Sequence, residues 1–258
     1  MKISFSQNNI NYSADTAFPI DISMPLRPGT DWVNCFYAPP VEFTPVRMGD
    51  FVGSTQEGGV VNFKNVRLNP HGNGTHTECV GHIAKEVFTI NQCLKKFHFP
   101  AQLITVWPSV QENGDRVIMK DMFEGCFPKI KGTEAIIIRT MPNDDLKLTT
   151  KYSGANPPFL HHEAMEYLVA QGVRHLLIDL PSVDREEDEG LLLSHHAFWK
   201  YPNTIAEKRE DCSITELIFV PDDIKDGQYL LHISIASFEM DASPSKPVLY
   251  AIKKEHTN

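Results

Sequence analysis

A short stretch in the first third of the chain concentrates side chains that can bind a metal ion or transfer a proton. The sequence NPHGNGTHTECVGHI, residues 69–83, contains three histidines, one glutamate, one cysteine and three glycines. Imidazole nitrogens suit zinc, manganese or iron, and a carboxylate can bridge two such ions. The composition therefore indicates either a metal-binding catalytic loop or a solvated turn that is rich in histidine.

The spacing within this stretch allows its chemical groups to meet. In an extended segment, His76 and Glu78 point to the same side. In a helical segment, Glu78 and His82 are four residues apart and share a face. The glycines before His76 allow sharp turns with positive φ where the backbone requires them. Such a turn would direct His71 and His76 toward one point.

More distant candidates matter because a catalytic metal site normally needs at least three protein ligands. The segment LLLSHHAFWK contains His195 and His196, and the apolar run SITELIFV contains Glu216. A glutamate in an apolar run is costly to bury unless it is paired or bound to metal. Two alternatives stay open. The tandem histidines could lie on the surface of a helix, and Glu216 could face solvent on an edge strand.

Composition limits the classes of partner. The chain has 258 residues, of which 41% are hydrophobic and 22% charged, with a net charge of −9 and no tract rich in lysine or arginine. This balance argues against nucleic acid and anionic membrane as main partners. We find neither a transmembrane run nor the apolar core of a signal peptide. Five widely spaced cysteines without a CxxC pair favour reduced thiols, so we expect a cytoplasmic protein.

The middle of the chain carries the clearest pattern of secondary structure. The runs EAIIIRT (134–140) and RHLLIDL (174–180) are predicted as buried strands. PPFLHHEAMEYLVAQG (157–172) is predicted as a helix, with Gly172 where a C-terminal cap is expected. Strand, helix and strand together indicate a β-α-β unit and hence some parallel sheet.

The remaining chain shows strands and loops without an internal boundary. GVVNFKNVRL (59–68) is one of several further runs predicted as buried strands. Neither an internal repeat nor a Gly/Ser-rich linker divides the sequence. We therefore predict a mixed α/β fold with a single domain over residues 1–258.

The order of these segments resembles the cyclase family of metal-dependent hydrolases, which includes bacterial kynurenine formamidases and isatin hydrolase. The family signature HxGTHxDxPxH is matched by GTHTECVGH, which keeps Gly74, Thr75, His76 and His82 in register. IDISMPLRPG resembles the opening strand and loop of the family, and the β-α-β unit resembles its central segments. The C-terminal run from ITELIFV to PVLYAI is similar to its last strands. The resemblance covers approximately residues 19–252.

The resemblance implies a division of roles among these residues. The implied metal ligands are His76, Glu78, His195 and Glu216. His82 would be the catalytic acid/base beside the metal. The implied cofactor is Zn²⁺, as one or two ions, or Mn²⁺. The implied fold is a single swivelling β/β/α-type domain with a mixed sheet, assembled as a homodimer or a higher homo-oligomer.

Two departures from the family pattern affect the metal ligands. The position of the first family histidine is taken by Gly72, so ligation by His71 requires a one-residue bulge in the loop. Glu78 stands where aspartate is usual, and its side chain is one methylene longer. At the tandem histidines, His195 is preferred over His196 because the HAFW sequence matches the apolar pattern that follows the family histidine.

These observations predict hydrolysis of a carbon–nitrogen bond in a small linear or cyclic amide, like that of an arylformamidase of tryptophan catabolism. A metal would lower the pKa of water and polarise the carbonyl, and His82 would pass a proton to the leaving nitrogen. Two alternatives stay open: a metal-dependent cyclase or lyase acting through an enolate-like oxyanion, and a catalytically inactive metal-binding homologue. Aromatic residues that could line a pocket for a small-molecule substrate are Phe36, Tyr37, Phe63 and Trp199.

Three other polar features are predicted to lie outside the chemistry. The acidic run DREEDEG, residues 184–190, is predicted as a solvated loop, although Asp184 matches a family position. His161 and His162 are expected on the surface or at a helix cap. Cys79 is not expected to be a nucleophile, because the sequence offers no histidine dedicated to its activation.

Overall fold

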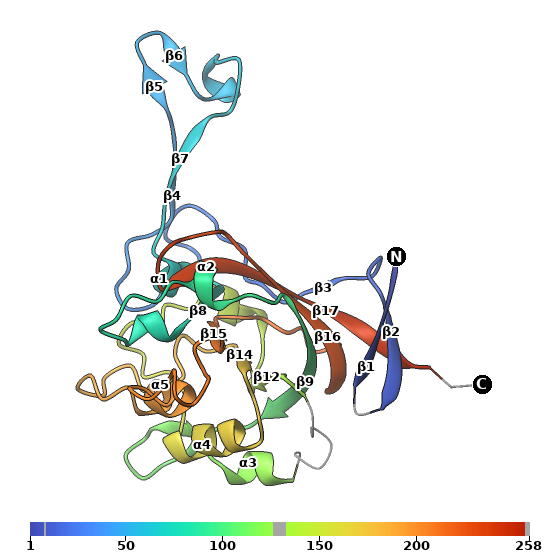
Figure 1. Ribbon diagram of the computed structural model, residues 1–258. Helices are drawn as coiled ribbons and strands as arrows, with labels where there is room; N and C mark the ends of the chain where they lie inside the picture. The colour runs from blue at the N-terminus through green and yellow to red at the C-terminus, as the bar shows by residue number, and fades with distance from the viewer. Residues whose placement is uncertain (8, 126–132, 256–258) are drawn as a thin grey trace.

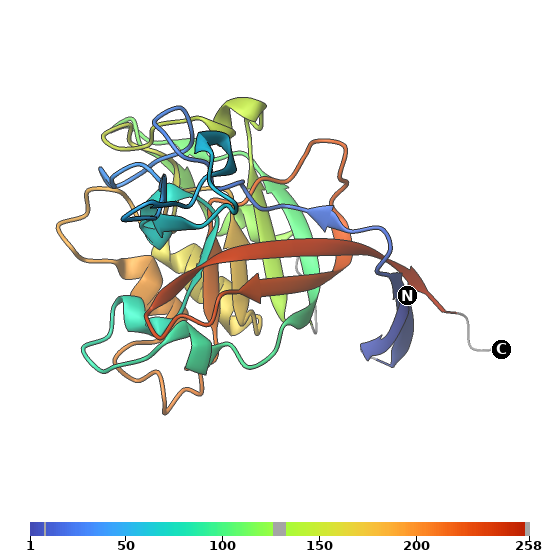
Figure 2. The same cartoon turned by 90° about the horizontal axis from the view of Figure 1, so that it is seen from above.

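The fold is organised by one sheet that closes on itself (Figures 1 and 2). The structure is a computed structural model that describes residues 1–7, 9–125 and 133–255, so Cys126 lies outside the described residues. Seven strands form the ring in the order β17-β16-β9-β12-β14-β15-β8, and β8 pairs back with β17. These strands are β8 (His76–Glu78), β9 (His98–Val106), β12 (Ala135–Thr140), β14 (His175–Ile178), β15 (Ser213–Glu216), β16 (Gly227–Ile235) and β17 (Ala242–Lys254).

The predicted β-α-β unit is confirmed. Strands β12 and β14 are parallel neighbours, with Ile137 opposite Leu177, and α4 (His162–Ala170) connects them. Strands β9 and β15 continue the parallel part of the sheet on either side, whereas β8, β16 and β17 join it antiparallel. The mixed sheet predicted from the sequence is therefore present, and the α/β fold class is confirmed.

The predicted helix begins later than expected. Phe159 and Leu160 instead form the short strand β13 (Phe159–Leu160), which pairs in parallel with Val117 and Ile118. His161 has an extended backbone, and its Nδ1 accepts a hydrogen bond from the Glu163 N–H, which caps the helix as expected. Gly172 lies beyond the helix end with φ 92°.

Both faces of the sheet are buried, which explains the continuous apolar runs of the parallel strands. Ile136 and Ile138 pack with Met165 of α4 and with Phe198 of α5 (Leu193–Trp199). Ile137 faces the opposite side and belongs to a second apolar cluster. The helices α3 (Asp121–Glu124), α4 and α5 lie on one side of the sheet in Figure 1.

A projecting arm contradicts the prediction of a buried strand over residues 59–68. Only β7 (Lys64–Arg67) forms there, all four of its residues are exposed, and its one partner is β4 (Glu42–Pro45). The arm stands away from the body of the molecule, with β5 (Arg47–Met48) and β6 (Phe51–Val52) at its tip (Figure 1). Within residues 1–7, 9–125 and 133–255, no layer covers the apolar residues of the arm, and periodicity alone does not reveal this.

The remaining elements are short. The other strands are β1 (Lys2–Gln7), β2 (Ile10–Asp15), β3 (Ile20–Asp21), β10 (Ser109–Val110) and β11 (Arg116–Ile118). The other helices and turns are α1 (Pro70–Asn73), α2 (Ile90–Cys93), η1 (Thr55–Glu57), η2 (Val80–His82) and η4 (Asp145–Leu148). Among the described residues, every helix is too short or too polar to cross a lipid bilayer.

The buried sheet predicts a large effect for a truncation at its centre. Leu177 is fully buried between Ile137 of β12 and Thr215 of β15. The substitution Leu177→Ala should lower the free energy of unfolding by about 2–5 kcal/mol, because it removes buried methyl groups and leaves a cavity. Urea unfolding measures the change. Leu146→Ala is the matched control, since Leu146 is 68% exposed; equal losses for the two variants would contradict this account of the core.

Candidate metal centre

Closure of the sheet places the first site residues opposite one another. Strand β8 lies between β15 and β17, with His76 paired to Glu216 and Glu78 paired to Ile214. Because side chains alternate along a strand, His76 and Glu78 point to the same face. The intervening Thr77 points to the other face, where its hydroxyl bonds that of Thr215 at 2.8 Å. The extended alternative for this segment is therefore the one the structure adopts.

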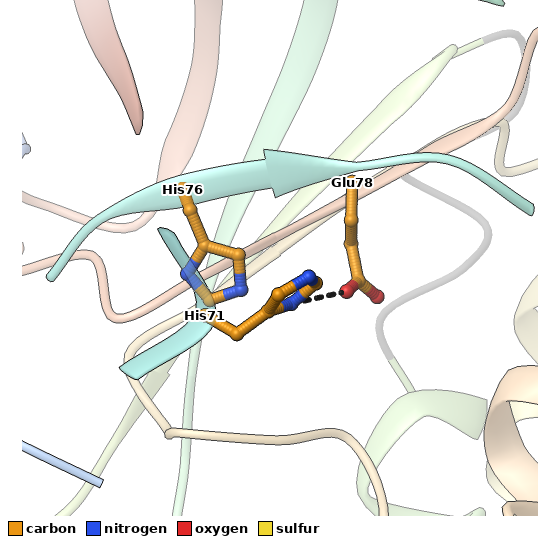
Figure 3. A group of neighbouring side chains, drawn as sticks. All are labelled: His71, His76 and Glu78. Carbon is orange, nitrogen blue, oxygen red and sulfur yellow. Dashed lines mark ion pairs between the residues drawn. The ribbon is translucent and has the colours of Figure 1, made fainter. Parts of the chain in front are cut away.

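His71 joins this group from the short helix α1. Figure 3 shows His71, His76 and Glu78 converging, with His71 Nδ1 lying 3.2 Å from Glu78 Oε2. The Asn69 side chain caps α1, and this helical turn carries His71 to the cluster. Gly72 is needed for close approach, because a Cβ there would lie 2.3 Å from the Cβ of Ala38.

His195 enters the cluster from α5. Its Nε2 lies 3.1 Å from Glu78 Oε1 and 3.9 Å from Glu216 Oε1, and the residue is 2% exposed. Asp184 holds it in place, accepting hydrogen bonds from the His195 ring Nδ1 at 2.6 Å and from its backbone N–H at 3.1 Å. The neighbouring His196 is instead directed toward the Tyr201 carbonyl. His195 is therefore the member of the pair that reaches the cluster.

Glu216 is buried, so the alternative of a solvent-facing edge strand is wrong. Strand β15 lies between β14 and β8, and Glu216 is 3% exposed. Its Oε1 accepts a hydrogen bond from the Val183 N–H at 2.9 Å, and its Oε2 lies 3.4 Å from His76 Nε2. The carboxylate is thus fixed on one side and directed at an imidazole on the other.

His82 lies at the open side of the cluster. The turn η2 brings its Nδ1 to 3.7 Å from Glu78 Oε2 and 3.4 Å from Asp241 Oδ2. The His82 and Asp241 side chains are 29% and 28% exposed, whereas that of Glu78 is fully buried. Access from solvent is therefore on the side of His82 and Asp241.

The hydrogen bonds of the histidines leave one nitrogen of each ring facing the carboxylates. The outer nitrogens are bound by Asp241 at His71, by the Gly74 carbonyl at His76, and by Asp184 at His195. His76 Nε2 and Glu78 Oε2 are buried without a hydrogen-bond partner. Such outer hydrogen bonds are typical of metal-ligating histidines. Imidazole nitrogens and carboxylate oxygens also suit Zn²⁺ or Mn²⁺, so the residues fit a metal ion.

Charge balance without a metal depends on protons. Burial opposes the charged form of each group here, yet interactions with the Asp241 and Glu78 carboxylates raise the pKa of His71 to about 10. Burial likewise opposes the charged form of His195, but the Asp184 and Glu78 carboxylates raise the pKa of His195 well above its usual value. The nearby histidines in turn lower the pKa of Glu78. Metal binding must therefore displace protons from this cluster.

The site contains two carboxylates that the sequence analysis did not assign to it. Asp241 was not among the predicted residues, although it contacts His71 and His82. Asp184 belongs to the run predicted as a solvated loop, and that prediction is wrong for this residue, which is 6% exposed. The backbone N–H groups of α5 and the His195 ring explain its burial, because they satisfy the carboxylate.

Other polar candidates lie outside the cluster. His161, His162 and Glu163 form a separate group at the start of α4. Cys79 is fully buried, and its hydrogen bond with Cys93 together with burial raises the pKa of the Cys79 thiol. A thiol held in its neutral form is a poor nucleophile, in keeping with the sequence analysis.

Comparison of the sequence with known proteins identifies a family and several relatives. Residues 20–185 match the family described as "Putative cyclase". The kynurenine formamidase of Bacillus cytotoxicus is 26% identical over 198 residues, which cover 75% of this chain and 82% of the relative. The kynurenine formamidase of Bacillus anthracis is 26% identical over 208 residues, which cover 77% and 85%.

Solved structures share the fold at lower identity. Isatin hydrolase A from Labrenzia aggregata bound to benzyl benzoate has a TM-score of 0.63 at 13% identity, covering 90% of this chain and 93% of that chain. A structure described as a potential metal-dependent hydrolase with cyclase activity has a TM-score of 0.62 at 16% identity, covering 90% and 97%. These likenesses bear on the fold alone.

The cluster predicts that Glu78 is required for metal-dependent stabilisation. Zn²⁺ or Mn²⁺ at a hundredfold excess over its Kd should stabilise the folded protein by about 2.7 kcal/mol. Glu78→Gln should abolish this gain, because the amide removes the negative charge between the histidines. Thermal unfolding with and without metal measures it, with Glu163→Gln as the control outside the cluster. Equal stabilisation of Glu78→Gln and the unsubstituted protein would contradict the assignment.

Proposed function

The chain belongs to the cyclase family, and from this premise we propose that it is a metal-dependent hydrolase that cleaves a carbon–nitrogen bond in a small linear or cyclic amide, as an arylformamidase does. One observation carries the proposal: His76 Nε2 and Glu78 Oε2 are buried without a hydrogen-bond partner within a group of imidazoles and carboxylates. The kynurenine formamidase relatives support an aryl formamide as the first substrate to test.

Five residues would hold the metal. They are His71, His76, Glu78, His195 and Glu216, which together offer nitrogen and oxygen atoms for one or two Zn²⁺ ions or for Mn²⁺. When bound, the metal supplies a water of lowered pKa and polarises a carbonyl group. The protein holds the ligands in place through Asp184, Asp241 and the closed sheet.

His82 is the residue proposed to move protons. It borders the cluster at its open side, within 3.7 Å of Glu78 and 3.4 Å of Asp241, and its side chain is partly exposed. An imidazole can take a proton from water near neutral pH and return it to a leaving nitrogen. Transfer to the nitrogen allows the amine to depart as a neutral group.

The aromatic candidates for substrate contact divide into two groups. Trp199 is fully buried in the core, and Phe63 lies in the projecting arm. Phe36 and Tyr37 are 40% and 77% exposed and lie in a loop joined to α1, whose Gly72 carbonyl accepts the Cys35 N–H. We therefore propose Phe36 and Tyr37, and not the other two, as contacts for an aryl substrate.

The test of hydrolysis is a substrate panel with product analysis. The metal-loaded protein is incubated with an N-formyl arylamine, an aryl lactam and a cyclic imide. Hydrolysis adds the elements of water: a formamide gives an acid and an amine, whereas a ring-opened lactam gives both groups in one molecule. Products that lack the added water would instead indicate the cyclase or lyase alternative. No turnover of any amide would contradict the proposal.

The proposed role of His82 predicts that its substitution affects turnover and leaves metal binding intact. His82→Ala should keep its metal and lose turnover by about 10²–10⁴-fold, the usual contribution of a general acid/base. Metal content and kcat on the best amide of the panel measure the two effects. His196→Ala, which alters a histidine outside the cluster, is the control. Full turnover of His82→Ala would rule out this role.

We also propose that the chain forms a homo-oligomer through its arm. Val60 and Val66 are 87% and 59% exposed there, and an isolated two-stranded ribbon is only marginally stable in water. Light scattering should give a mass of at least two chains, and Val60→Lys with Val66→Lys should lower it. Val110→Lys on the body, where Val110 is 75% exposed, is the control. A monomeric unsubstituted protein would refute the proposal.

A further inference from the structure

A single oxygen of Asp241 lies between two histidines that have different proposed roles. Asp241 Oδ2 is 2.8 Å from His71 Nε2 and 3.4 Å from His82 Nδ1. The rings of His71 and His82 lie beside each other, with their centroids 4.4 Å apart. The carboxylate therefore contacts both a proposed ligand and the proposed acid/base.

We propose that Asp241 is a positioning residue that sets the ring orientation and the protonated nitrogen of both His71 and His82. The part concerning His82 as acid/base rests on the proposed function. The orientation of the two rings and its effect on metal affinity do not depend on any substrate.

At His71, the contact with Asp241 determines which nitrogen faces the cluster. A neutral imidazole has one N–H donor and one lone pair. In the neutral form that binds a metal ion, His71 Nε2–H donates to Asp241 and the lone pair is on Nδ1, which lies 3.2 Å from Glu78 Oε2. Two electron-rich atoms at that separation repel each other unless a proton or a cation lies between them. Asp241 thus prepares His71 Nδ1 to bind a metal ion.

At His82, both neighbouring carboxylates lie on the Nδ1 side of the ring. Asp241 Oδ2 and Glu78 Oε2 are 3.4 Å and 3.7 Å from Nδ1. The hydrogen bond to Asp241 and the negative charge of Glu78 both favour the proton on Nδ1, which leaves the Nε2 lone pair to act as a base. A carboxylate that holds one imidazole nitrogen in this way fixes the tautomer used in proton transfer.

The backbone of Asp241 is anchored independently of its side chain. The Asp241 carbonyl accepts a hydrogen bond from the Cys79 N–H at 3.0 Å, and the next residue, Ala242, pairs with Glu78. The same strand pairing that positions Glu78 therefore positions Asp241. Because the side chain is partly exposed, its substitution should leave the strand in place.

The test uses Asp241→Asn and Asp241→Ala in the metal-loaded protein. The first readout is Zn²⁺ affinity by competition with a chelator, which should fall by about 10–100-fold, as for other groups that orient ligating histidines. The second is the imidazole ¹⁵N–¹H spectrum, in which His82 should lose its preference for the Nδ1–H form. A substitution that only loosened the packing around the site would not change the tautomer of His82.

Glu239→Gln is the matched control. Glu239 is a carboxylate two residues earlier that binds Thr89, Asn91 and Gln92, so both readouts should stay unchanged. Unaltered Zn²⁺ affinity and His82 tautomer in Asp241→Ala would overturn the proposal. A fall far beyond the 10–100-fold range expected for an orienting group would also overturn it, because it would identify Asp241 as a direct ligand. Neither readout needs a substrate, so failure here is distinguishable from failure of the hydrolysis panel.

Discussion

The structure depends on two buried carboxylates that lie on the same face of neighbouring strands. Glu78 and Glu216 are both less than 5% exposed, and a buried carboxylate is strongly unfavourable unless positive charge compensates it. The raised pKa values of His71 and His195 let these two imidazoles supply that charge as protons, and a metal ion would supply it in their place. The turn at α1 brings His71 to these oxygens, and helix α5 brings His195.

The closed sheet makes this arrangement possible. Strand β8 has only three residues, yet it pairs on both edges and presents two of them to the cluster. Farther along the sheet, the buried pair of Lys147 and Asp179 fixes the end of β12, because Lys147 also bonds the Thr140 carbonyl. From Asp179 the chain continues to Val183, whose N–H holds Glu216. The framework and the site are thus joined by hydrogen bonds as well as by packing.

Local sequence patterns predicted those elements whose conformation depends on residues close to one another in the chain. The Ile-Ile-Ile run of β12 and the apolar spacing of α4 specify a buried β-α-β unit, because both faces of that strand meet other layers. For the GTHTE segment, the extended alternative predicted a common face for His76 and Glu78 through strand alternation, and the structure adopts it. The resemblance to the cyclase family then singled out His195 and Glu216, which do lie beside them.

The contacts that the sequence did not predict are long-range. Asp241 is 170 residues from His71, and only the pairing of β17 with β8 brings them together. Asp184 lies in an acidic run that is otherwise mostly solvated, and its partners in α5 are not visible from composition. The arm has the same apolar pattern as a buried strand, but none of the residues that the structure describes forms a layer over it.

Metal analysis of the purified protein, with His76→Ala beside it, tests the central claim most directly. The account predicts bound zinc or manganese that His76→Ala loses; a metal-free protein that takes up neither ion on addition would contradict it.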